Sequence, residues 1–118
     1  MQVTWQKCNH GDHWCSLEYL NLEKLGDAAG VYIIWHEGNP SRVVRVGQGK
    51  PIGKRLSDHR NDKEILAYSE YGTLRVTWAE VPSSQRDGVE RYLGDTLKPL
   101  IGSTFPDVDP ILVNLPWK

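Results

Sequence analysis

The stretch that decides the fold reads Gly30-Val31-Tyr32-Ile33-Ile34-Trp35. Most of its side chains are β-branched or aromatic, and they are apolar at both alternating positions, a pattern typical of a strand buried on both faces. We therefore expect this segment at the centre of a sheet. A turn over residues 36–41 follows, and residues 42–47 return as the second strand of a hairpin.

The chain beyond this hairpin alternates between helix and strand. A basic helix is expected over residues 52–60, a third strand over residues 74–81, and a second helix over residues 84–98 with Ser83 or Ser84 as its cap. The pattern predicts an α+β fold in the order β-β-α-β-α, with a three-stranded sheet flanked by helices. An N-terminal extension and a proline-broken C-terminal wrap complete it.

Length and composition predict one compact domain. The chain has 118 residues, of which 39% are hydrophobic and 25% are charged, enough to bury a core. We assign residues 1–29 to the extension and residues 30–118 to the main body of the domain. No apolar run approaches the roughly 20 residues that span a bilayer, and the start lacks the layout of a signal peptide. These features favour a cytoplasmic protein without a membrane partner.

The charge of the chain is unevenly distributed. The net charge is −1, which argues against binding of nucleic acid by bulk electrostatics. Between Arg42 and Lys63, however, seven cations stand against two acids, and the remainder of the chain carries a net charge of −6. This segment predicts a positive face that attracts a polyanion, and such an interaction should weaken as salt rises. The alternative is an ordinary solvated helix surface.

A set of short motifs begins in the central strand and continues in a fixed order along the rest of the chain. They are Gly30-Val31-Tyr32, Arg45-Val46-Gly47, Arg55 and His59 on the first helix, Glu90 on the second helix, and Asn114 in the tail. Arg55 lies ten residues after Arg45, and His59 lies four after Arg55. In order and spacing the chain resembles the GIY-YIG nuclease superfamily over residues 30–115. The ordered set is specific, whereas each triplet alone is weak.

The resemblance implies a metal-dependent endonuclease that hydrolyses DNA phosphodiester bonds by in-line attack of water. It implies Glu90 as the ligand of Mg²⁺ or Mn²⁺ and Arg55 as the clamp on the phosphate, which suits a transition state that gathers negative charge. Tyr32 would position or deprotonate the water, and His59 would orient water or a phosphate oxygen. The expected catalytic residues are Tyr32, Arg45, Arg55, His59 and Glu90, and the expected nucleic-acid-binding residues are Arg42, Lys50, Lys54, Arg60 and Lys63.

One position departs from the pattern of the superfamily. The second triplet usually begins with Tyr, and here it begins with Arg45. A permanent cation beside Tyr32 either lowers the pKa of the phenol or marks a chain that binds without cutting. The alternative to a nuclease is therefore a catalytically inactive nucleic-acid-binding module with the same fold. A third interpretation, an interaction protein, rests on the acidic remainder of the surface.

The N-terminal extension contains four side chains able to bind zinc, namely Cys8, His10, His13 and Cys15. Their spacing does not match the paired knuckles of structural zinc sites, so we expect ordinary packing of Trp14 and Cys15, with zinc binding as the alternative. Two cysteines are too few for a disulfide scaffold. We therefore expect a reducing compartment.

Overall fold

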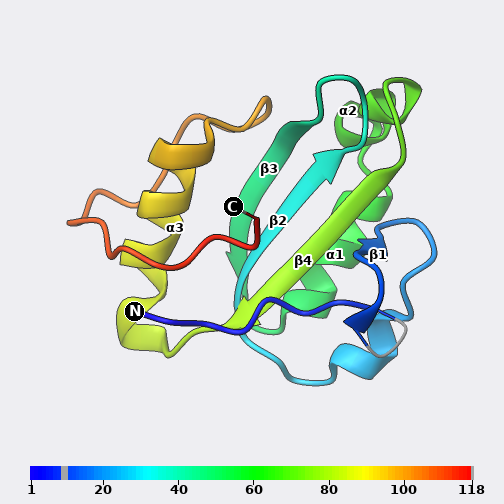
Figure 1. Ribbon diagram of the computed structural model, residues 1–118. Helices are drawn as coiled ribbons and strands as arrows, with labels where there is room; N and C mark the ends of the chain where they lie inside the picture. Colours follow the sequence, from blue (N-terminus) through cyan, green and yellow to red (C-terminus); the bar gives the residue numbers. More distant parts are fainter. Residues whose placement is uncertain (9–10, 118) are drawn as a thin grey trace.

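An antiparallel sheet of four strands organises the chain, which the computed structural model describes over residues 1–8 and 11–117 (Figure 1). The strands lie in the order β1-β4-β2-β3. Their bounds are Cys15–Ser16 for β1, Gly30–His36 for β2, Arg42–Gly49 for β3 and Leu74–Glu80 for β4. The α+β class is confirmed, and the three expected strands are present. The fourth, β1, has only two residues and is too short to produce an alternating pattern.

Strand β2 occupies the centre of this sheet, with β4 on one side and β3 on the other. Val31, Ile33 and Trp35 belong to one buried cluster, whereas Tyr32 and Ile34 belong to a second cluster on the opposite face. Burial on both faces explains why the segment is apolar at both alternating positions.

The helices are divided between the two faces of the sheet (Figure 1). The Tyr32 face is covered by α1 (Ile52–Arg60), and α2 (Lys63–Leu66) and the 3-10 turns η2 (Leu22–Leu25) and η3 (Ala67–Glu70) belong to the same side. The opposite face is covered by α3 (Ser83–Leu97). The expected serine cap of α3 is wrong, because Pro82 occupies the cap position and no side chain caps the helix. None of the helices in the described residues is long and apolar enough to cross a membrane.

The two ends of the described chain are joined by Asn114. Its Oδ1 accepts a hydrogen bond from the backbone N–H of Val3 at 2.7 Å, and its Nδ2 donates to the Val3 carbonyl at 3.0 Å. The Trp5 indole also donates to the Asn114 carbonyl. Nearby, Trp117 packs edge-on against Trp35 with ring centroids 4.9 Å apart. Asn114 thus pairs with the N-terminal segment as a neighbouring strand would.

The cysteines correct one expectation from the sequence and weaken one alternative. Cys8 and Cys15 form a disulfide, so they are not the free thiols that a reducing compartment would maintain. The oxidised sulfurs cannot act as thiolate ligands for zinc. His10 lies outside the described residues, and residues 1–8 and 11–117 contain no group of three His, Cys, Asp or Glu side chains that could hold a metal ion.

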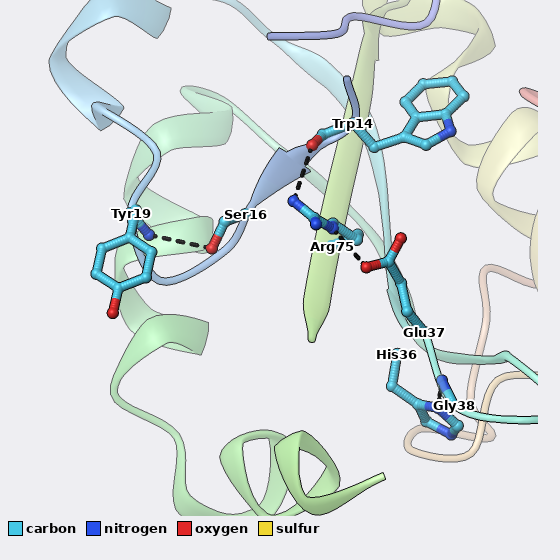
Figure 2. A network of polar contacts seen from close by, with 7 residues as sticks. All are labelled: Trp14, Ser16, Tyr19, His36, Glu37, Gly38 and Arg75. Carbon is cyan, nitrogen blue, oxygen red and sulfur yellow. Dashed lines mark hydrogen bonds and ion pairs between the residues drawn. The ribbon is translucent and has the colours of Figure 1, made fainter. Parts of the chain in front are cut away.

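The disulfide-linked segment is also tied to the sheet through Arg75 of β4, as Figure 2 shows. The guanidinium donates from Nε to Glu37 Oε1 at 2.9 Å and from a terminal nitrogen to the Trp14 carbonyl at 3.2 Å. These contacts connect the start of β1 with the turn after β2.

Candidate active site

A buried tyrosine–histidine pair lies between the sheet and α1. The phenol oxygen of Tyr32 is 2.6 Å from Nε2 of His59, with Tyr32 wholly buried and His59 only 5% exposed. Ile52, Leu56 and His59 recur at helical spacing and form the buried face of α1. His59 therefore lies on the core side of the helix, and its buried nitrogen has a hydrogen-bond partner, as such a group requires.

Two glycines of β3 make room for this site. Gly47 lies directly opposite Tyr32, and a Cβ atom there would be 2.3 Å from the Tyr32 hydroxyl oxygen. A Cβ atom at Gly49 would be 2.8 Å from Cγ of Arg55. Residues two apart in a strand share a face, so Arg55 and Tyr32 lie on the same side of the sheet. The glycine that ends the second triplet thus has a steric reason to be there.

Two arginines contribute positive charge beside the pair. Arg45 lies opposite Ile34 in the register, which places it on the Tyr32 face, and its Nε is buried without a hydrogen-bond partner among the described residues. Within residues 1–8 and 11–117, neither Arg45 nor Arg55 forms an ion pair. A buried guanidinium nitrogen without a partner is costly unless an anion approaches it. The arrangement therefore suits a phosphate oxygen.

Burial and these charges set the proton positions of the pair. Burial raises the pKa of Tyr32, and the nearby positive charges of Arg55 and Arg45 oppose this effect without overcoming it. Arg45 thus acts in the expected direction, but the pKa of Tyr32 is raised overall because the effect of burial is larger. Burial, followed by Arg45 and Arg55, lowers the pKa of His59 to about 4. At neutral pH the phenol is protonated and the imidazole is uncharged.

Glu90 approaches the same region from the opposite face of the sheet. It is half-buried on α3, and its Oε1 accepts a hydrogen bond of 2.7 Å from the side-chain amide of Gln48. The same amide nitrogen donates to Asp87 Oδ1 at 2.7 Å. Burial raises the pKa of Glu90 and the charge of Asp87 adds to this, whereas the Gln48 hydrogen bond and then Arg55 and Arg45 lower it.

The carboxylates of Asp87 and Glu90, one helical turn apart, offer the oxygen donors that Mg²⁺ and Mn²⁺ prefer. The sequence motifs do not include Asp87 or Gln48, although the sequence contains a feature that points to each of them. Asp87 lies three residues before Glu90 on the same helix, and Gln48 follows the triplet glycine at the alternating position that faces α3. Because β3 is an edge strand, groups from both faces can meet at its edge.

The expected nucleic-acid-binding residues fall into two groups, those exposed to solvent and one that is hydrogen-bonded within the protein. Four are exposed, namely Arg42, Lys50, Lys54 and Lys63. Arg60 differs, because its guanidinium donates to the backbone carbonyls of Leu17, at 2.9 Å, and Leu20. Arg60 thus holds the N-terminal extension against α1. The two guanidinium nitrogens that donate to these carbonyls are already hydrogen-bonded within the protein. Asn114, the last residue of the motif set, joins the two ends of the described chain, and none of its hydrogen bonds with described residues involves Tyr32 or His59.

Comparison with protein-family models, with curated proteins and with solved structures finds no match to this chain.

Proposed function

We propose that this chain is a GIY-YIG-type endonuclease that hydrolyses DNA phosphodiester bonds with a divalent metal ion. One observation carries the proposal: the buried Tyr32–His59 pair lies beside two arginines that form no ion pair with any described residue. Unpaired guanidinium groups bind phosphate oxygens in bidentate geometry, and they stabilise the charge that develops in the transition state. The resemblance of the motifs supports the same conclusion.

In this proposal, binding of the phosphate prepares the histidine for catalysis. Arg45 and Arg55 lower the pKa of His59 in the free protein. A phosphate anion between them offsets their charge, so the pKa of His59 rises towards the range of a useful base. The Tyr32 hydroxyl then accepts a proton from the attacking water as it donates its own to Nε2 of His59. The water oxygen forms a bond to phosphorus while the bond from phosphorus to the leaving oxygen breaks, and the leaving oxygen takes a proton from solvent water. Arg55 and Arg45 hold the phosphate for in-line attack.

The carboxylates on α3 fit a divalent cation. Glu90 would hold the ion, with Asp87 as a neighbouring oxygen donor, and Gln48 would orient both carboxylates. Few protein ligands suffice for Mg²⁺, which retains several waters and binds substrate phosphates. The ion would supply positive charge at the oxygens of the scissile phosphate.

The alternative function is a nucleic-acid-binding module without catalysis. The raised pKa of Tyr32 and the low pKa of His59 favour it, because both groups are poor bases in the free protein. A cytoplasmic location also stays a proposal. The Cys8–Cys15 disulfide does not support it, since reducing compartments rarely maintain such bonds.

Plasmid nicking with Mg²⁺ or Mn²⁺ tests the proposal, with EDTA expected to abolish it. Glu90→Gln should lose both Mn²⁺ binding and nicking, because it removes the charge that attracts the cation. Arg55→Ala should keep Mn²⁺ binding and lose about 10²–10³ in rate, as deletion of one oxyanion donor does.

Glu18→Gln removes an exposed carboxylate outside the site and should match the wild type. Thermal melts check the folding of each variant. Wild-type nicking by Glu90→Gln would contradict the metal assignment. A wild type that binds DNA and nicks it with neither ion would establish the non-catalytic alternative.

A further inference from the structure

A pocket lies at the far end of β2 from the paired Tyr32 and His59. It has a volume of about 600 Å³, and its wall includes three aromatic rings, those of His36, Tyr68 and Tyr71. We propose that this pocket, here named the ring pocket, binds an unpaired nucleobase of the nucleic-acid strand whose phosphate lies at Arg45 and Arg55. The proposal rests on the proposed function for the phosphate site, and it specifies a single-stranded or locally opened substrate.

The rings form a stacking surface. His36 is stacked on Tyr68 with an interplanar angle of 7° and on Tyr71 with an angle of 29°. His36 is 4% exposed, whereas Tyr71 leaves 65% of its surface open to solvent. The exposed ring of Tyr71 also lies against the ring of Tyr68, with centroids 5.9 Å apart, so the three rings form one group in the pocket wall. Proteins that bind single-stranded nucleic acid place aromatic rings in this way, because every base has a face that can stack.

His36 also brings a polar group to the ring pocket. Its Nδ1 accepts a hydrogen bond from the backbone N–H of Gly38 at 3.0 Å, as Figure 2 shows. With Nδ1 acting as an acceptor, the proton of the ring is on Nε2. That N–H has no hydrogen-bond partner in the described part of the chain. It can donate to an acceptor on the edge of a base, and the Glu70 carboxylate in the same wall can accept from an exocyclic amino group.

The position and charge of the ring pocket favour a nucleic-acid strand as its occupant. His36 and Tyr32 are four residues apart in one strand, so they lie on the same face, about 13 Å apart along β2. Arg42, which pairs with His36 in the register, lines the ring pocket and forms no ion pair within the described residues. Arg45 lies further along β3. The two cations thus connect the ring pocket with the phosphate site, as a phosphate backbone requires.

Binding of a short single-stranded oligonucleotide that contains 2-aminopurine tests the proposal. The measurement is made in EDTA, so that no cleavage occurs and the result is independent of nuclease activity. Stacking of the fluorescent base in the ring pocket should quench its emission. Tyr71→Ala should weaken binding about 10-fold, within the range of roughly 5- to 150-fold for one stacked base, and Tyr71→Phe should retain it. Tyr19→Ala is a matched control, since Tyr19 is also exposed and does not line this pocket.

A second oligonucleotide, with an abasic site in place of 2-aminopurine, separates the base from the phosphates. It should bind wild-type protein about 10-fold more weakly than its parent and should be indifferent to Tyr71→Ala. Equal affinity for both oligonucleotides would overturn the ring-pocket proposal and leave the nuclease proposal intact. Base-dependent binding without nicking would refute the nuclease alone. Absence of oligonucleotide binding would overturn the nucleobase assignment in favour of another class of ligand.

Discussion

Replacement of His59 by Gln should remove a specific part of the pH dependence of stability. The pKa of His59 is lowered to about 4 from its ordinary value of 6.5, and the imidazole is almost completely buried. Below pH 6.5 the unfolded chain protonates this ring, whereas the folded protein does not do so until the pH approaches 4. The unfolded state therefore binds more protons, and the free energy of unfolding falls as the pH falls.

The two pKa values correspond to a loss of about 3 kcal/mol, most of it by pH 4.5. This is a large share of the 5–15 kcal/mol that is typical of a domain. His59→Gln cannot titrate, yet its amide oxygen can still accept a hydrogen bond from Tyr32. The unfolding free energy of the wild type minus that of the variant should therefore be lower at pH 4.5 than at pH 7.5 by about this amount.

Urea denaturation at intervals across this pH range measures the effect. Subtraction of the variant's curve removes the contribution of carboxylates, which titrate in both proteins. Circular dichroism at pH 7.5 checks that His59→Gln retains the fold. Parallel curves for the two proteins would refute the reasoning, because they would show that burial and the two arginines do not suppress protonation of His59.

Two further substitutions test the packing around the site. Gly47→Ala would bring a methyl group within 2.3 Å of the Tyr32 hydroxyl oxygen, so we expect a loss of about 1–3 kcal/mol in urea denaturation, together with reduced nicking. An unchanged midpoint would show that Tyr32 has room to move. Asn114→Ala should cost about 1–2 kcal/mol through two lost hydrogen bonds to the N-terminal segment. Its nicking rate per folded molecule should match the wild type, and a specific loss of rate would assign Asn114 to catalysis instead.

The local sequence pattern is sufficient to predict the main helices and strands and part of the candidate site. The apolar run at β2 predicts a central strand because both of its faces are buried, and that property requires apolar residues at every position. Arg55 and His59 share a helix face because residues four apart in a helix are neighbours on its surface. The spacing between the triplets also holds, since Tyr32 and Gly47 are directly paired in the hairpin. These features depend on residues that are close in sequence or joined by a short turn.

The features that the local pattern does not predict depend on contacts between segments far apart in sequence. The Cys8–Cys15 disulfide and the attachment of Arg60 to Leu17 depend on how the N-terminal extension folds back, which no local period encodes. The link from Gln48 to Glu90 joins residues 42 apart in sequence.

The direction of each pKa shift likewise required the tertiary structure. In sequence, Arg45 suggested a more acidic phenol at Tyr32. Burial raises the pKa of that phenol by more than the arginines lower it, because desolvation disfavours the charged form and its extent is set only by packing.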